Sequence, residues 1–170
     1  MSSDLIRISL HFRIKATMDY IYQINISKGT LPKLPIKEAF VRLEGILGDK
    51  HEVGISGGPD KALCIFSLQE INKLKAEGHS IVPGSVGENL TISFEEYALL
   101  VPGVTLKIGS EVTIRITSFY EPAKNIAGVF TEGKVGRISQ KSYPGCSRLY
   151  AKVLDVGKIK VGDTIEIIPS

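Results

Sequence analysis

A carboxylate and a carboxamide stand side by side where a glycine-rich turn leads into a strand. Gly87 is followed by Glu88 and Asn89, and the apolar residues Leu90 and Ile92 then alternate with polar ones. Glycine lets a ligand or another segment approach the backbone closely, and apolar alternation is typical of a half-buried strand. The stretch is therefore a candidate polar binding site. The alternative is a tight turn in which Asn89 bonds its own backbone.

A second glycine-rich loop ends at a basic residue. It contains Ser56, Gly57, Gly58 and Lys61, and its glycines allow backbone N–H groups to face an anion. The same Gly-Gly-Pro-Asp segment is also typical of a plain turn. Lys33 lies on another loop, which two prolines stiffen. Because most lysines in proteins are simply solvated, these residues alone do not establish an anion site.

The two cysteines differ in their surroundings. Cys64 lies within the continuous apolar run 62–66, which predicts a buried strand where the thiol acts as a small hydrophobic group. Cys146 lies in a Pro-Gly-Cys-Ser turn, and Arg148 and Lys141 are near enough in sequence to lower the pKa of an exposed thiol there. Two cysteines do not form a disulfide framework in a chain of 170 residues, so we expect a reduced, cytoplasmic protein.

Length, charge and histidine content exclude several classes of protein. A chain of 170 residues is large enough for a real core, and we expect one domain over 1–170. The net charge of +3 is too small and too scattered to predict nucleic-acid binding. No apolar run reaches the roughly 18 residues that span a bilayer, so no membrane contact is expected. The three histidines are scattered, and we predict neither a metal site nor a standard nucleophile or phosphate-loop motif.

Short strands separated by glycine and proline dominate the chain, and one helix is clear. Ser67 and Glu70 form a capping box, apolar residues recur every three positions, and Gly78 follows, which predicts a helix over 67–77. We expect strands at 20–26, 40–45, 62–66, 90–92, 106–109 and 111–117, a closing hairpin of 148–154 with 158–168, and helical turns at 94–98 and 126–130. The pattern predicts a mainly β fold, a barrel or sandwich with a few short helices.

Five segments together resemble the MOSC domain family, which is named after the C-terminal part of molybdenum cofactor sulfurases. They are, in order, 27–33, 45–50, 57–62, 84–91 and 157–163, and the resemblance covers about residues 20–168. One such motif alone is weak, but five in the family's order are specific. The resemblance implies a single domain with a β-barrel of the type first seen in a pyruvate kinase domain.

The resemblance also implies a pocket for the molybdenum cofactor, molybdopterin. Family members carry sulfur or reduce N-hydroxylated compounds with electrons from a separate redox partner, and the family is also associated with pyridoxal phosphate. The residues that this resemblance makes candidates for cofactor binding are Lys33, Ser56, Gly57, Gly58, Lys61, Gly87, Glu88, Asn89, Lys124 and Arg148.

The family's central cysteine is missing from this chain. It stands in a Pro-Cys pair after a strand, where a thiolate can ligate a soft metal or carry sulfur, and the matching pair here is Pro122-Ala123. Ser56 likewise stands where many members have histidine, and Cys146 is the candidate substitute for the thiol. Three functions stay open: a cofactor-dependent enzyme or sulfur carrier, a non-catalytic module that binds a pterin or another anion, and a protein-interaction domain.

Overall fold

The fold is mainly β with a few short helices, as predicted. The computed structural model describes residues 18–50 and 58–170, so Ser56 and Gly57 lie outside the described residues. The strands are β1 Tyr20–Ile26, β2 Leu34–Ile36, β3 Glu38–Arg42, β4 Gly45–Ile46, β5 Leu63–Ser67, β6 Leu90–Ser93, β7 Thr105–Ile108, β8 Val112–Tyr120, β9 Arg148–Asp155, β10 Gly157–Lys160 and β11 Ile165–Ile168. The helix α1 spans Leu68–Ala76, and the 3-10 helices are η1 Pro59–Lys61, η2 Tyr97–Leu99, η3 Lys124–Val129, η4 Thr131–Gly133 and η5 Val135–Ile138.

The strands form two sheets. The larger has eight strands in the order β11-β7-β8-β9-β5-β6-β1-β2, and the smaller has the order β10-β3-β4. Ile21 N donates to Asp163 O and Ile165 N donates to Asp19 O, each at 2.9 Å, so the start of β1 touches the segment around the start of β11. No strand ladder among the described residues closes the larger sheet, and the barrel architecture stays a prediction.

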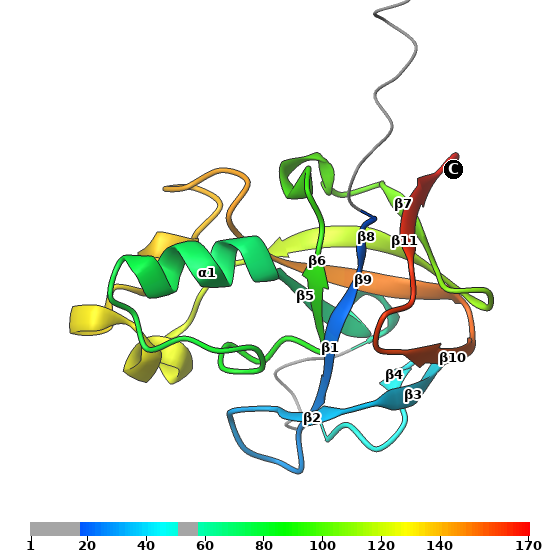
Figure 1. Cartoon of the computed structure of the whole chain (residues 1–170), viewed down its shortest axis with the longest axis horizontal. Helices are drawn as coiled ribbons and strands as arrows, with labels where there is room; N and C mark the ends of the chain where they lie inside the picture. The colour runs from blue at the N-terminus through cyan, green and yellow to red at the C-terminus, as the bar shows by residue number, and fades with distance from the viewer. Residues whose placement is uncertain (1–17, 51–57) are drawn as a thin grey trace, which may run out of the picture.

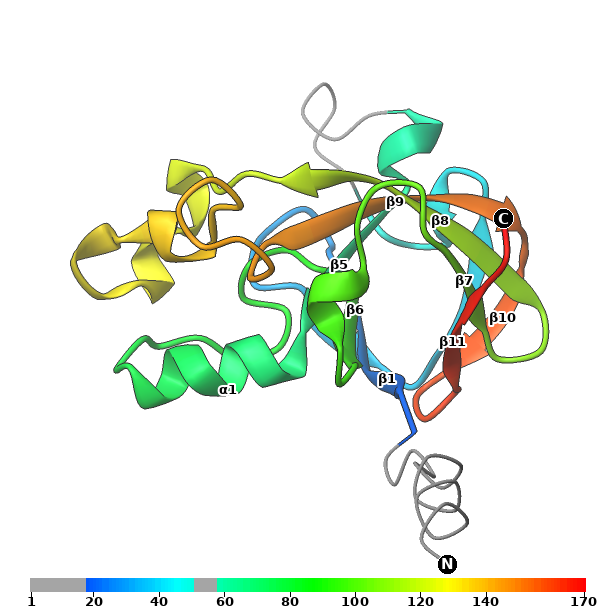
Figure 2. The same cartoon turned by 90° about the horizontal axis from the view of Figure 1, so that it is seen from above.

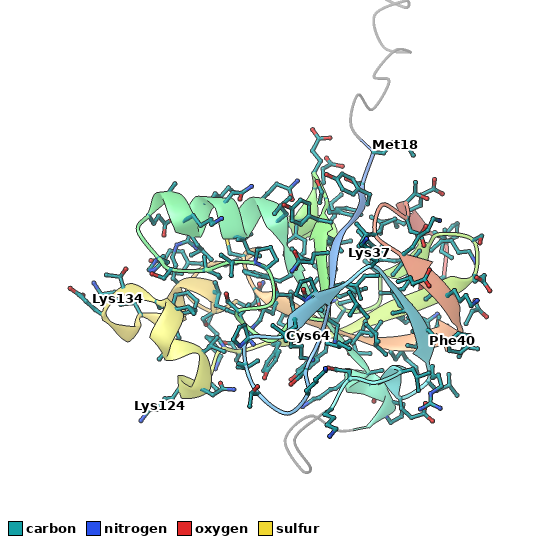
Figure 3. The ribbon with its side chains drawn as sticks, turned by 60° about the horizontal axis from the view of Figure 1, so that its bottom comes forward. Met18, Lys37, Phe40, Cys64, Lys124 and Lys134 are labelled. Carbon is teal, nitrogen blue, oxygen red and sulfur yellow. The ribbon has the colours of Figure 1, made fainter. Side chains whose placement is uncertain are left out.

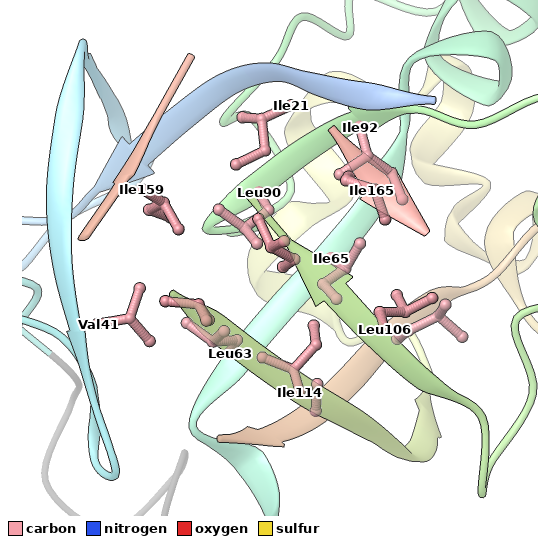
Figure 4. Packing of buried hydrophobic residues seen from close by; sticks show 14 of the residues in the cluster. Ile21, Val41, Leu63, Ile65, Leu90, Ile92, Leu106, Ile114, Ile159 and Ile165 are labelled. Carbon is pink, nitrogen blue, oxygen red and sulfur yellow. The ribbon is translucent and has the colours of Figure 1, made fainter. Parts of the chain in front are cut away.

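The main core lies between the two sheets and is built by alternate residues of each strand. Figure 4 shows Leu63 and Ile65 of β5 facing Val41 of β3 and Ile159 of β10, with Ile114 of β8 beside them. Each is at most 2% exposed, and each buried methylene stabilises the fold by about 0.8 kcal/mol. Because side chains alternate along a strand, the neighbours of these residues face away from this core.

The helix α1 begins and ends close to where the sequence predicts. The Ser67 hydroxyl accepts a hydrogen bond from Glu70 N at 3.2 Å, which caps the first turn, and Gly78 follows the last turn with φ near +96°. Ile71 and Leu74 pack with Phe66 in a second apolar cluster. In Figures 1 and 2, α1 and the segment of 3-10 turns occupy one end of the molecule, opposite β7, β10 and β11.

The predicted closing hairpin is wrong. β9 pairs with β5 and β8, whereas β10 pairs with β3 and β11 pairs with β7. The turn after β9 therefore sends the chain into the smaller sheet instead of folding it back on β9. Sequence alternation identifies a strand, but the partner of a strand depends on burial of its apolar face against distant segments.

A buried carboxylate ties three separate segments together. The Asp49 carboxylate accepts hydrogen bonds from Lys33 Nζ at 2.9 Å, from Asn89 Nδ2 at 2.8 Å and from Ser27 N at 2.7 Å. The side chain of Asp49 is 0% exposed and that of Lys33 is 10% exposed. Burial alone would raise the pKa of Asp49, but the Lys33 ammonium and these hydrogen bonds hold it below its usual value of 3.8. The network fixes the end of β1, the loop before β2 and the start of β6 relative to one another.

A glycine allows two of these segments to approach closely. Gly84 has φ near +90°, and Lys33 N donates to Gly84 O at 3.0 Å. A Cβ atom added to Gly84 would lie 2.3 Å from Lys33 O. Gly103 has a similar φ of +100° but has nothing within 4 Å of the added atom. Gly84 therefore meets two constraints, one from conformation and one from space, and Gly103 meets only the first.

Replacing Gly84 with alanine should destabilise the fold more than the same change at Gly103. Gly103→Ala should lower the free energy of unfolding by about 1 kcal/mol because of the left-handed backbone. Gly84→Ala should lower it by about 1–3 kcal/mol more, since the backbones must move apart. Urea denaturation of both variants measures the difference, and equal losses would show that the contact with Lys33 is not tight.

Replacing Asp49 with asparagine should leave Lys33 buried without its anion. We expect Asp49→Asn to lower the free energy of unfolding at pH 7 by about 3 kcal/mol, and Asp60→Asn, at an exposed acid 3.8 Å from Lys152, to lower it by less than about 1 kcal/mol.

The pH dependence of this loss follows from the lowered pKa of Asp49. A depressed pKa means that the ionised carboxylate stabilises the fold above 3.8, and that this contribution disappears as the pH falls through the lower folded-state value. The gap between the unmodified chain and Asp49→Asn should therefore close in acid. A gap of constant size from pH 7 to pH 3, measured by urea denaturation, would contradict the assignment.

Candidate functional site

A cavity of about 370 Å³ opens beside the Asp49 network. Its walls come from the end of β1, the loop before β2, the turn before β6, and the strands β5, β8 and β9. The lining residues are Ser27, Gly29, Thr30, Leu31, Lys33, Lys50, Lys61, Cys64, Val86, Gly87, Asn89, Tyr120, Asn125, Arg148 and Tyr150. This volume is within the range of pockets that hold small molecules and cofactors.

The lining is cationic. Lys33, Lys50, Lys61 and Arg148 line the cavity, and no aspartate or glutamate is among the described lining residues. The Lys33 charge is balanced by Asp49 behind it, so the uncompensated charges at the wall are Lys50, Lys61 and Arg148, which form no ion pair with any described residue. Since opposite charges attract strongly in a partly desolvated cavity, the wall favours an anionic ligand.

Arg148 is a buried cation that the surrounding backbone holds in place. The residue is 1% exposed, its Nη1 donates to Val86 O at 2.6 Å, and its Nη2 donates to Glu121 O at 3.4 Å. Its Nε is buried and has no hydrogen-bond partner among the described residues. A buried donor without a partner costs free energy, so a ligand acceptor at this atom would be favourable.

Arg148, Tyr120 and Tyr150 stack on one another in that order. The Arg148 guanidinium lies 3.7 Å from the centroid of the Tyr120 ring, and the Tyr120 and Tyr150 rings are stacked with centroids 4.2 Å apart. Lys61 Nζ lies 5.2 Å from the centroid of Tyr150. Burial and the neighbouring Tyr120 hydroxyl raise the pKa of Tyr150, so its phenol stays a neutral hydrogen-bond donor. The wall thus offers both cations and flat aromatic surface.

Asn89 lines the cavity and is held by hydrogen bonds to Cys64 and Asp49. Its Oδ1 accepts from Cys64 N at 3.0 Å, its Nδ2 donates to Asp49, and its own N donates to Cys64 O at 2.8 Å. Glu88 beside it is 0% exposed and does not line the cavity. Glu88 Oε1 instead accepts from Gly84 N at 2.7 Å and from the Thr91 hydroxyl at 3.0 Å, and burial raises the pKa of Glu88. Glu88 therefore shapes the turn, and Asn89 faces the cavity.

The structure brings half of the sequence-predicted site residues together. Lys33, Lys61, Gly87, Asn89 and Arg148 all line the cavity. Gly58, Glu88 and Lys124 are described but do not line it, and Ser56 and Gly57 lie outside the described residues. Figure 3 shows Lys124 at the periphery, on the segment of 3-10 turns, whereas Cys64 lies in the middle of the molecule.

Neither predicted position for the catalytic thiol faces the cavity. Ala123 is exposed and does not line it, although Tyr120 and Asn125 on either side do. Cys146 is half-buried and does not line it either. Burial and then the adjacent Glu70 raise the pKa of Cys146, and the cation that opposes this effect is Arg137. The expectation that Arg148 and Lys141 lower this pKa is wrong, because Arg148 points into the cavity wall instead.

Sequence reasoning did not identify the other lining residues, which include Lys50, Cys64, Tyr120, Asn125 and Tyr150. The continuous apolar run 62–66 predicts a buried strand with Cys64 as a small hydrophobic group, and the strand is buried as predicted. No alternation in hydropathy marks the two faces of β5 in the sequence, and the structure shows that Leu63 and Ile65 fill the core whereas Cys64 faces the opposite way. Tyr150 lies directly opposite Cys64 in the β5–β9 register, and Tyr120 lies opposite Arg148.

The residues that the structure describes do not form a conventional metal centre at this site. Within residues 18–50 and 58–170, no group of three or more His, Cys, Asp or Glu side chains could hold a metal ion. None of the helices in these ranges is both long and apolar enough to span a membrane. What the arrangement can do is hold an anion against fixed cations, with one thiol and several neutral hydrogen-bonding groups nearby.

Solved structures share this fold at low sequence identity. The YuaD protein from Bacillus subtilis is 16% identical with a TM-score of 0.74, over 89% of this chain and 96% of that protein. YiiM from Escherichia coli is 19% identical with a TM-score of 0.69, over 91% of this chain and 71% of that one. YiiM from Geobacillus stearothermophilus is 20% identical with a TM-score of 0.65, over 89% and 75%. At such identities the likeness shows the fold alone.

Family membership rests on the sequence itself. None of the curated proteins matches the chain significantly. The family model of the MOSC domain matches residues 52–166, more than half of the chain and including most of the cavity-lining strands. The chain therefore belongs to the MOSC domain family.

Proposed function

We propose that this cavity binds an anionic, phosphate-bearing heterocycle of the molybdopterin class. The observation that carries the proposal is the charge of the wall: three cations that form no ion pair with any described residue, and no described acidic residue, line a cavity of about 370 Å³. Membership of the MOSC family supports the choice of this cofactor among anionic ligands. We also infer a reducing, cytoplasmic setting, because Cys64 and Cys146 are both free thiols.

The residues present fit the organic part of this cofactor. A phosphate needs fixed cations and N–H donors, and Arg148 provides a buried guanidinium whose Nε lacks a partner among the described residues. Lys61 and Lys50 provide further cations on the wall. A flat heterocycle needs apolar and aromatic surface with hydrogen-bonding groups at its edge, and Tyr120, Tyr150 and the amide of Asn125 lie on the same wall.

The wall is organised before any ligand arrives. Arg148 is held by two backbone carbonyls and by the face of Tyr120, so its side chain loses little conformational freedom on binding. Asn89 is held by Cys64 and by Asp49, so its amide cannot rotate freely. These residues bind and orient the anion, and the bound cofactor would supply redox or sulfur chemistry at its metal.

A non-catalytic role is the second candidate function. It is favoured by the alanine at position 123, which is exposed and has no donor atom. Reduction of N-hydroxylated compounds would use a thiolate at the metal and a separate protein that supplies electrons, and sulfur transfer would use a thiol that carries the sulfur atom. If no other thiol takes this role, the domain would bind the cofactor without turning over a substrate.

Removing one lysine from the wall should weaken retention of the cofactor. We expect Lys61→Ala to lower the pterin-to-protein ratio of protein purified from a molybdopterin-producing host by about tenfold, the effect of losing one charge-assisted contact. Lys124→Ala removes the same charge from an exposed site away from the cavity and should leave the ratio unchanged. Fluorescence of the oxidised pterin measures both ratios.

The result also separates this proposal from its alternatives. Pterin absent from the unmodified chain would overturn the proposed ligand, and equal losses in both lysine variants would place binding elsewhere on the surface. Retention of a yellow phosphate-bearing pyridoxal compound instead of pterin would replace the ligand class while keeping the anion site.

A further inference from the structure

Cys64 belongs to the cavity and not to the apolar core. Leu63 and Ile65 on either side of it fill the main core, so the Cys64 side chain leaves the opposite face of β5. It lines the cavity, is 5% exposed, and lies directly opposite Tyr150 in the adjacent strand. It is the single thiol among the described lining residues, because Cys146 lies elsewhere.

The surroundings of this thiol point to an anionic partner. Arg148, 1% exposed and with a buried Nε that lacks a partner among the described residues, lines the same cavity as Cys64. Burial raises the pKa of Cys64 to about 11, while the charges of Arg148 and Lys33 act in the opposite direction. Cys64 and Arg148 line one cavity, so an anion held at Arg148 would share that cavity with the thiol, whose proton a soft metal displaces on binding.

Charge and ligand number restrict the kind of metal that fits. A free divalent cation would be repelled by Lys50, Lys61 and Arg148, and one thiol cannot fill its coordination shell. No cluster of three potential metal ligands exists among residues 18–50 and 58–170. A metal can reach Cys64 favourably only inside a complex that is anionic overall and that brings its remaining ligands with it.

We propose that Cys64 Sγ is the protein ligand to a soft metal carried by an anionic organic cofactor in this cavity. This inference rests on the proposed function and adds to it the ligating residue, which takes the role that Ala123 cannot fill. The step is a ligand exchange without electron transfer. The thiol proton leaves to solvent, the Sγ–metal bond forms, and the metal releases one solvent ligand.

Three variants of the full chain, purified from a molybdopterin-producing host, test the role of Cys64. Cys64→Ser should keep the pterin-to-protein ratio of the unmodified chain but lower the molybdenum-to-protein ratio at least tenfold. Cys146→Ser removes the other thiol, which does not line the cavity, and should keep both ratios. Lys61→Ala should lower both ratios together. X-ray absorption should show one sulfur ligand fewer in any metal that Cys64→Ser retains.

Each contrary outcome identifies which idea fails. Full molybdenum content in Cys64→Ser, with pterin present, would overturn the role of Cys64 and leave the proposed function intact. Loss of metal in Cys146→Ser instead would assign the thiol to position 146. Pterin and metal both absent from the unmodified chain would overturn the proposed function.

A probe without molybdopterin tests the role of Cys64 even if the unmodified chain contains neither pterin nor metal. Aurothiomalate is an anionic complex of a soft metal, and it transfers gold to a protein thiol while thiomalate leaves with the thiol proton. We expect its adduct, located by mass spectrometry, at Cys64 in preference to Cys146, and slower formation in Lys61→Ala than in Lys124→Ala. An adduct confined to Cys146 would overturn the inference.

Discussion

The buried carboxylate of Asp49 is the constraint on which the site depends. An ionised group with a side chain 0% exposed must find partners, and Asp49 finds them in Lys33, Asn89 and the backbone of Ser27. Ser27 and Lys33 stand on the loop between β1 and β2, whereas Asp49 lies 16 residues beyond Lys33 and Asn89 a further 40 residues along the chain. Their convergence places the loop before β2 beside the turn before β6, and the space left next to them is the cavity. The contacts that the buried Asp49 carboxylate requires therefore also position residues that line the cavity.

The two faces of the larger sheet carry different tasks. On β5 and β9, Leu63, Ile65 and Leu149 fill the core, while Cys64, Tyr150 and Arg148 alternate with them and face the cavity. Residues that pack in the core and residues that line the cavity therefore alternate along each of these two strands. A substitution on the cavity face can change binding while the core face keeps the fold, which makes the site open to change during evolution.

Local sequence signals predicted the helix and most of the strands, but they did not predict which residues line the cavity. The capping box at Ser67 and the alternation of β1 depend on neighbouring residues, and both elements lie where predicted. The pairing of β10 with β3 depends on distant burial, so the hairpin prediction failed. Cys64 was missed for a related reason: a strand buried on both faces shows no alternation in hydropathy, and only the three-dimensional structure distinguishes a core face from a cavity face.

The alanine at position 123 does not disturb Arg148, because the interactions that hold Arg148 do not involve the side chain of residue 123. Arg148 is held by the carbonyls of Val86 and Glu121 and by the ring of Tyr120, and none of these contacts needs a side chain at position 123. The absence of a thiol at that exposed position therefore leaves the contacts of Arg148 unchanged. On the proposed function, Arg148 would hold the anion and Cys64 would ligate the metal, so the two roles would fall on different residues of the same cavity.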